Sequence, residues 1–495
     1  MRPILIKDDS PRCSEETRTA AIHPRGLAAA AAPRFSEPFG PARRVALAFE
    51  RSSHFRIMCV LLAAWWMAFL YPHIMIDNIA AALVTAGEAT AEGSLYNQLL
   101  LIVWAGFGII HLPRAVRAVQ SRQSRRLLLL LSLYLAWAIL SMVWSQDRLL
   151  STRRLIALLC LLIGGFGLGA GFYSRTRNGL KTLGRHSIYA AGICVVLLFA
   201  LRFWQGNLMD LLNPQWSLKA TTQIETYAYP LAFAVVAATF LFHRNLLKQC
   251  VAVGTLFLVV VVLKGRTIVI DIISAAGVVY SRITGIRAMR VAVLAISCAL
   301  AALLADLMTG GEYIIQPIVV MSDVIGTWLP YLSIGDGLRN ITSLSGRLPL
   351  WQALLRYAAE RPYLGYGFGA FWVPSRFPEI LAAAKWRAVV AHNGYLDEIL
   401  ATGVIGLALL LMFWFYGMYM SARLRSSGYL AFGWMLLFLY LNVMGSIIQS
   451  FFNFPTLITA VALAIVMDQH AAGRGPHAGT ASGAARRTRS DRPPR

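Results

Sequence analysis

Two side chains suited to phosphate and proton chemistry enclose one stretch of the sequence, with Arg347 at its start and His392 at its end. A guanidinium can hold a diphosphate through two parallel hydrogen bonds, and a histidine at a helix boundary can act as a general base near neutral pH. Simpler roles are also open, because an arginine can reach towards lipid headgroups and a histidine can bond a nearby carbonyl. The elements that position the two residues therefore decide which of these roles each residue has.

The residues after Arg347 predict an amphipathic helix that lies on a membrane surface. Pro349 suits the first turn of this helix, and Pro362 ends it. Its apolar face is expected to consist of Trp351, Leu354, Leu355 and Ala358.

A run of alternating glycines follows, at Gly365, Gly367 and Gly369. It comes after no expected strand and opens no helix, which excludes a dinucleotide-binding turn. The run predicts a tight turn that brings the backbone close to a ligand or to a neighbouring helix, and both possibilities are open.

A hydrophobic helix is expected to begin just after His392, where Asn393 can cap its first turn. Positions 392, 396, 399 and 403 share one face of such a helix, so His392 lies above Gly403. The small size of Gly403 allows close packing against another helix. The N-terminus of this helix also attracts phosphate.

A third candidate is Arg266, which lies with Lys264 between two apolar runs in the segment KGRTIVI. An arginine inside or beside a membrane is costly, so it is a candidate functional residue, with a plain hairpin turn as the alternative. Carboxylates are sparse, with Asp77 the strongest lone candidate, and they show no metal-ligand spacing. We therefore expect no metal and no cofactor.

The composition is that of a polytopic membrane protein. The 495 residues are 57% hydrophobic and only 14% charged, against roughly 25% charged in a soluble domain. The net charge of +23 does not indicate a nucleic-acid partner, because the arginines lie in tails and short loops between apolar runs. That pattern is typical of cytoplasmic anchoring and of contact with anionic membrane lipids. The six cysteines form no CxxC pair, and all but Cys13 lie in apolar runs as small hydrophobes.

The expected fold is an all-α, polytopic transmembrane helical bundle of about twelve spans. The apolar segments lie at 57–76, 95–112, 127–144, 153–173, 186–204, 226–243, 248–264, 266–281, 291–308, 394–417, 429–446 and 448–467. The seventh and eighth are nearly fused, so they form either a hairpin or two half-helices broken at Gly265. Residues 1–56 and 471–495 are expected to be disordered cytoplasmic tails.

Basic residues between the spans fall mostly on one side, which the positive-inside rule assigns to the cytoplasm. The exceptions, on the opposite side, are Arg148, Arg153 and Arg154. This orientation gives a first transmembrane bundle at 57–308, an extracytoplasmic loop at 309–393 that contains the amphipathic helix, and a second transmembrane bundle at 394–470. A loop of this length is usually functional.

Three blocks in this order, SGRLPLW, ERPYLGYGFGAF and AHNGYLDEILATGVIG, resemble the O-antigen ligase and polysaccharide polymerase superfamily over residues 345–406. The segment HNGYLD is most similar to the corresponding segment of the exopolysaccharide polymerases. The family's histidine, followed by glycine eleven positions later, is matched by His392 and Gly403, and its loop arginine by Arg347.

The family's span arginine, which has a leucine four positions on, is matched loosely by Arg266 and Ile270. The sequence departs from the family pattern before this arginine, where Lys264–Gly265 replaces the usual serine or threonine. It departs again at Thr402, where an acidic residue is common.

The resemblance implies a metal-independent, inverting membrane glycosyltransferase of the GT-C kind, acting on oligosaccharides carried by undecaprenyl diphosphate. Arg347, Arg266 and Lys264 would hold the departing diphosphate, and His392 would take the acceptor's proton or orient the sugar. Residues expected to support this site are Gly365, Gly367, Asn393 and Gly403. The resemblance also implies a bacterial inner-membrane protein with cytoplasmic termini, a periplasmic active site, and a flippase and chain-length regulator of the same pathway as partners.

Two other functions are compatible with the sequence. A ligase that transfers glycan to lipid A core or to protein would use the same donor chemistry. A secondary transporter suits about twelve spans, but the halves show no internal repeat and the candidate polar residues gather at one outer face instead of the midplane.

Overall fold

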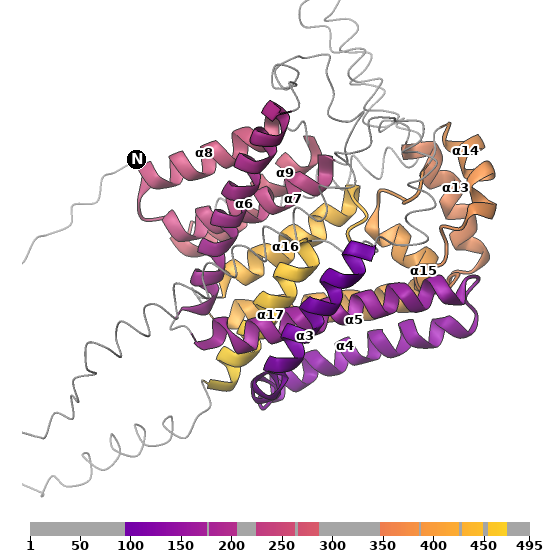
Figure 1. Cartoon of the computed structure of the whole chain (residues 1–495), viewed down its shortest axis with the longest axis horizontal. Coiled ribbons are helices and arrows are strands. Elements are labelled where there is room, and N and C mark those ends of the chain that lie inside the picture. Colours follow the sequence, from indigo (N-terminus) through magenta and orange to yellow (C-terminus); the bar gives the residue numbers. More distant parts are fainter. Residues whose placement is uncertain are drawn as a thin grey trace, which may run out of the picture. The chain divides into compact units, whose positions relative to one another are not determined.

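The computed structural model describes residues 95–175, 178–204, 224–262, 266–286, 347–385, 388–424, 428–448 and 454–472, all within the second of two units, residues 56–495. In these ranges the regular structure is helical and contains no strand (Figure 1). The α-helices are α3 (Leu95–Ala118), α4 (Arg122–Leu140), α5 (Arg148–Gly171), α6 (Gly179–Trp204), α7 (Ile224–Phe242), α8 (Leu246–Val262), α9 (Arg266–Thr284), α13 (Arg347–Glu360), α14 (Phe377–Ala384), α15 (Gly394–Arg423), α16 (Tyr429–Met444) and α17 (Phe454–Ala472). Three short 3-10 turns are η1 (Ser141–Val143), η2 (Tyr173–Arg175) and η7 (Pro374–Arg376).

Ten of the twelve expected spans coincide with helices that the structure describes, α3 to α9 and α15 to α17. The other two, at 57–76 and 291–308, lie outside the described residues, as do residues 1–56 and 473–495. Four segments are long and apolar enough to cross a membrane, namely Arg122–Val143, Arg148–Gly171, Gly394–Arg423 and Phe454–Ala472. The helices are those of an integral membrane protein, while the total of twelve spans and the GT-C likeness stay predictions.

Six helix starts differ from the expected boundaries by two to seven residues, and those of α5 and α17 have a local explanation. α5 begins five residues early, at Arg148, because the Asp147 side chain caps it by accepting from the Leu150 amide at 2.9 Å. α17 begins at Phe454, six residues later than expected, and Pro455 occupies its first turn.

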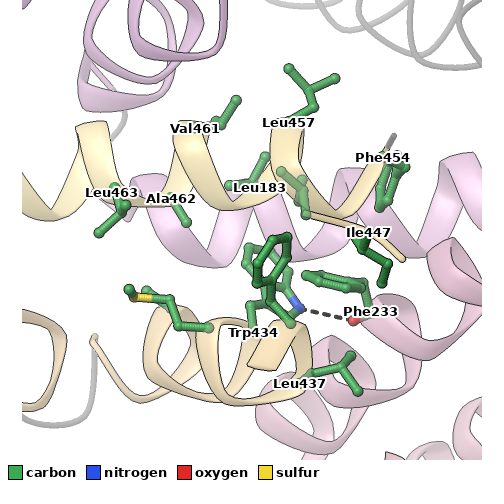
Figure 2. Packing of buried hydrophobic residues seen from close by; sticks show 14 of the residues in the cluster. Leu183, Phe233, Trp434, Leu437, Ile447, Phe454, Leu457, Val461, Ala462 and Leu463 are labelled. Atoms are coloured by element: carbon green, nitrogen blue, oxygen red, sulfur yellow. Dashed lines mark hydrogen bonds between the residues drawn. The ribbon is translucent and has the colours of Figure 1, made fainter. Parts of the chain in front are cut away.

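The main core extends through the bundle, and Figure 2 shows the part of it where α7, α16 and α17 meet. Trp434 of α16 is fully buried, and its indole Nε1 donates to the carbonyl oxygen of Phe233 on α7 at 2.9 Å. The Phe233 ring packs edge-on against Phe454 of α17, with centroids 6.1 Å apart. α7 is buried at every position from 228 to 240, which is typical of a helix at the centre of a bundle.

α3 and α5 approach each other closely because glycines remove the side chains between them. A Cβ on Gly167 of α5 would collide with the backbone of Gly108 on α3, and one on Gly108 would lie 2.7 Å from the Cα of Gly164. Small residues at such crossings are characteristic of helix packing in membranes.

One end of the bundle carries residues 347–385, called the loop block, which contain α13, η7 and α14. The orange helices α13 and α14 lie beside the start of α15 and the connection between α4 and α5 (Figure 1). The indole Nε1 of Trp144, in that connection, donates to the carbonyl of Leu364 at 3.0 Å, and the Gln146 amide donates to the carbonyl of Tyr366 at 3.2 Å. A second hydrophobic cluster, separate from the main core, fills the space between α13, α14 and the start of α15.

Candidate functional site

Arg347 begins α13, in agreement with the sequence, and it is half-buried. Its Nη1 donates to the carbonyl oxygen of Met444, the last residue of α16, at 3.1 Å. The buried face of the helix consists of Leu350, Trp351, Leu354 and Ala358. The expectation for Leu355 is wrong, since its side chain is 43% exposed. At 100° per residue, position 355 lies at the edge of the face that 350, 354 and 358 define.

A hydrogen bond joins the helix of Arg347 to the segment of His392. The indole Nε1 of Trp351, one turn after Arg347, donates to the carbonyl oxygen of Ala391 at 2.7 Å. Ala391 directly precedes His392, and both Trp351 and Ala391 belong to the second hydrophobic cluster. Met444 packs against the same cluster. The structure therefore brings the surroundings of Arg347 and His392 together across 45 positions of sequence.

His392 has a left-handed backbone, with φ of 52°, immediately before α15. This conformation is uncommon for residues other than glycine, although histidine is among those that adopt it more often. The Asn393 side chain then caps α15, as the sequence predicts, by accepting from the Leu396 amide at 3.1 Å. Gly394 faces α16 so closely that a Cβ there would collide with the side-chain oxygen of Asn442.

α15 is broken at Gly403, whose φ of 72° and ψ of −177° are not helical. Gly403 does pack closely, since a Cβ there would collide with the carbonyl oxygen of Tyr363, but its neighbour is the loop after α13 and not the expected second helix. The break frees backbone groups, and the loop after α13 pairs with them. Tyr366 and Gly367 donate their amides to the carbonyls of Leu400 and Ala401 at 2.8 and 2.9 Å, and the Val404 amide donates to the carbonyl of Pro362 at 2.8 Å.

The glycine run forms the tight turn that the sequence predicts, and its neighbours are α15, α5 and the connection between α4 and α5. Gly365, Gly367 and Gly369 all have positive φ, at 62°, 101° and 68°. A Cβ on Gly365 would lie 2.7 Å from the Ala401 backbone, and one on Gly367 would lie 2.5 Å from Ser145. Of the two possibilities that the sequence leaves open, these contacts favour close packing against neighbouring helices.

Three residues that were not predicted to be site residues, Asp397, Arg154 and Trp372, form a polar group around a buried carboxylate near His392. Asp397, on the first turn of α15, is 2% exposed. Its carboxylate accepts from the Trp372 indole at 2.9 Å and from the Ala391 amide at 3.1 and 3.2 Å. Arg154 of α5 donates to the carbonyl of Gly369, and its charge acts on Asp397. Arg154 was one of the exceptions to the positive-inside pattern, and that exception was the signal for its role.

The next residue, Glu398, is also fully buried but faces other partners. Its Oε1 accepts from the hydroxyl of Tyr134 on α4 at 3.1 Å and from the hydroxyl of Thr402 at 2.5 Å. The two adjacent carboxylates thus have different partners, because Asp397 binds the loop block and Ala391 whereas Glu398 binds α4.

Arg266 is the first residue of α9, and Lys264 lies outside the described residues. Five residues after Arg266, Asp271 lies close enough to Tyr395 of α15 for its charge to act on that hydroxyl. Five residues correspond to about 7.5 Å along a helix axis. The backbone of α9 therefore starts at the same end of the bundle as α15.

A cation–aromatic stack stiffens the outer part of the loop block. The Arg376 guanidinium lies 4.1 Å from the ring centroid of Tyr366 and 4.5 Å from that of Phe371. Burial lowers the pKa of Arg376. Burial and a hydrogen bond to Glu379 raise the pKa of Tyr357 to about 12, and burial with a hydrogen bond to Glu360 raises the pKa of Tyr366.

An open cavity of about 650 Å³ lies between Ser145–Arg148 and Val373–Arg376. Most of the side chains that line it are polar, which suits a hydrated or sugar-like ligand better than a lipid tail. Among the residues that the structure describes, no group of three or more His, Cys, Asp or Glu side chains is placed to hold a metal ion.

Residues 226–411 match the family model described as O-Antigen ligase. A search of curated proteins finds no match for the chain. The matched range runs from the start of α7 into α15 and includes Arg266, Arg347, His392 and Gly403, so it covers the three sequence blocks and the helices that they join. This match over residues 226–411 supports the resemblance of the chain to the O-antigen ligase and polysaccharide polymerase superfamily.

Proposed function

We propose that the protein is a membrane glycosyltransferase that joins undecaprenyl-diphosphate-linked oligosaccharide repeat units into exopolysaccharide or O-antigen on the periplasmic face of the bacterial inner membrane. The observation that carries this proposal is the hydrogen bond from Trp351 to Ala391, which holds the helix headed by Arg347 against the segment of His392. This contact supports a site in which Arg347 would supply a cation and His392 a proton acceptor at the end of a bundle of apolar helices.

The proposed reaction is a direct displacement with inversion. The acceptor hydroxyl oxygen attacks the anomeric carbon of the donor sugar, and the bond from that carbon to the diphosphate oxygen breaks. The carrier diphosphate leaves with the electron pair, and His392 takes the acceptor's proton. Arg347, with Arg266 and Lys264, neutralises the charge that develops on the leaving group, a role that a metal ion fills in other enzymes. Membrane lipids and the lipid-linked substrate are the partners that this reaction requires.

Incubation of the purified protein with lipid-linked repeat units, followed by product sizing on a gel, tests the proposal. We expect a ladder of chain lengths from the wild type and none from His392→Ala or Arg347→Ala at equal protein levels. Matched controls are Arg356→Ala, an exposed arginine on the same helix, and His243→Ala, at the end of α7. Undiminished chain length in either site variant contradicts the assignment.

The second candidate function is that of a ligase, which the description of the matched family favours. A deletion strain separates the two. Loss of a polymerase leaves single repeat units, whereas loss of a ligase leaves long chains on the carrier lipid. Flipping of the lipid-linked substrate in liposomes, without any product ladder, points to a transporter instead.

A further inference from the structure

The peptide that precedes His392 is held from both sides by side chains. The Asp397 carboxylate accepts from the Ala391 amide at 3.1 and 3.2 Å, and the Trp351 indole donates to the Ala391 carbonyl at 2.7 Å. Ala391 itself is fully buried. The next residue, His392, has the left-handed φ of 52°. A non-glycine residue keeps such a conformation when its surroundings impose it, and these contacts are the surroundings.

Asp397 is bound to the loop block as well as to Ala391. Its Oδ1 accepts from the Trp372 indole at 2.9 Å. Trp372 lies three residues after Gly369, whose carbonyl accepts from the Arg154 guanidinium. A buried carboxylate is costly without compensating charge and hydrogen bonds. Here two N–H donors bind it, and the positive charge of Arg154 acts on it from α5.

We propose that Asp397, together with Arg154 and Trp372, is a positioning residue for His392, fixing the imidazole's place through the Ala391 peptide. This inference rests on the proposed function, in which His392 receives the acceptor's proton. Asp397 is 2% exposed and its oxygens are occupied by donors of the protein, so it acts through His392 and does not touch the substrate.

Glu398 provides a matched control because it is the adjacent residue and equally buried. Its Oε1 accepts from Tyr134 of α4 and from Thr402 of α15, and neither of these residues belongs to the segment that carries His392. A general requirement for buried carboxylates in this helix would affect both residues alike. If Asp397 positions His392, the substitution of Asp397 lowers activity more than the substitution of Glu398.

The kinetic test compares Asp397→Asn with Glu398→Gln in the purified protein, with lipid-linked repeat units as substrate. Displacement of a reacting group by about 1 Å can cost roughly 100-fold in rate. We therefore expect kcat of Asp397→Asn to fall by about 10- to 100-fold while KM for the donor changes by no more than about twofold. Glu398→Gln is expected to keep kcat close to wild type. Equal losses in the two variants, or a raised KM with an unchanged kcat for Asp397→Asn, overturn the proposal.

A second measurement does not depend on glycosyl transfer. The imidazole signals of histidine-labelled protein are recorded by NMR, with the His392 signal assigned through His392→Ala. We expect this signal to move in Asp397→Asn and to stay in place in Glu398→Gln, and the opposite result contradicts the positioning role. If the wild type forms no glycan product, the proposed function fails while this spectrum still decides the role of Asp397.

Two further variants guard against a folding defect. Trp372→Phe removes one donor to Asp397 and leaves both charges in place, so it is expected to show the same pattern at smaller size. In a double-mutant cycle, Arg154→Gln and Asp397→Asn are expected to be non-additive, because each removes one charge of the same buried group. Additive losses in kcat would falsify the coupling.

Discussion

The indole nitrogen of Trp351 donates to the carbonyl of Ala391 at 2.7 Å, so that two segments forty positions apart share one buried hydrogen bond. Trp351 lies one turn after Arg347, and Ala391 lies one residue before His392. Neither residue carries chemistry of its own. Their bond links the two segments that carry the proposed site residues Arg347 and His392, so it is the first target for mutation.

Replacement of Trp351 by Phe keeps most of the ring and removes the N–H donor. The buried Ala391 carbonyl then loses this partner, which costs about 1–3 kcal/mol. We expect a lower thermal unfolding midpoint together with a shortened product ladder. Trp434→Phe is the matched control, because Trp434 donates to the Phe233 carbonyl at 2.9 Å within the main core. It should lose comparable stability and keep the full ladder at a temperature where both variants are folded.

Alanine at Gly403 is expected to be among the most damaging small substitutions in α15. The position has φ of 72°, and a Cβ there would collide with the carbonyl oxygen of Tyr363. Strain of about 1–3 kcal/mol is typical of such backbone alone. Size-exclusion profiles in detergent should show loss of the folded species. Gly106→Ala in α3, where a Cβ meets nothing within 4 Å, should leave the profile unchanged. If Gly403→Ala gives the same profile as Gly106→Ala, the break in α15 at Gly403 is contradicted.

Substitution of Arg376 should loosen the loop block without touching its helices. Arg376→Met keeps the apolar stem and removes the guanidinium that stacks on Tyr366 and Phe371. The loss is about 0.5–2 kcal/mol. We expect this loss to appear as faster limited proteolysis within 361–385. Arg356→Met, at an exposed arginine of α13, is the control. Identical cleavage rates in the two variants exclude a stabilising role for the stack.

The ionisation of Tyr357 offers a test by pH. Its pKa is raised to about 12, chiefly by burial and by the hydrogen bond to Glu379. A raised pKa means that the neutral phenol is the form that the fold favours. Its contribution is therefore complete below pH 10 and declines as the pH rises towards 12. The difference in phenolate absorbance between wild type and Tyr357→Phe should have its midpoint near pH 12.

Glu379→Gln serves as the comparison for that titration. Because the Glu379 charge raises the pKa of Tyr357, its removal should move the midpoint of the Tyr357 difference signal down towards pH 10. A midpoint that stays in place indicates that the carboxylate does not act on this hydroxyl in solution.

Much of the site was predictable because its signals are local. Pro349 and the apolar spacing after it predicted α13, and the Asn393 side chain capped α15 as expected. The glycine run predicted a tight turn for the same reason, since positive φ favours glycine over a few residues. These features depend on residues that are close together in the sequence, so the sequence alone predicts them.

The residues that were missed depend on contacts across the whole chain. Arg154 reaches Gly369, 215 positions away, and no periodicity encodes that pairing. Two signals were nevertheless present. Arg154 broke the charge pattern of the loops, and Asp397, like its neighbour Glu398, is an ionisable residue within a largely apolar helix, which marks a candidate functional position by default. The break at Gly403 left no such signal, because a glycine that packs closely and one that interrupts a helix look alike in sequence.

The interruption of α15 also decides how much of that helix has to lie in lipid. Its 30 residues would measure about 45 Å if they were continuous, against a hydrocarbon layer of about 30 Å. The residues after Gly403, 404–423, are about 30 Å long by themselves and suffice for the crossing. The turns before Gly403, which carry Asp397 and Glu398, are thus not needed to cross the hydrocarbon layer and can lie in the headgroup region. Neither carboxylate therefore has to lie in the hydrocarbon.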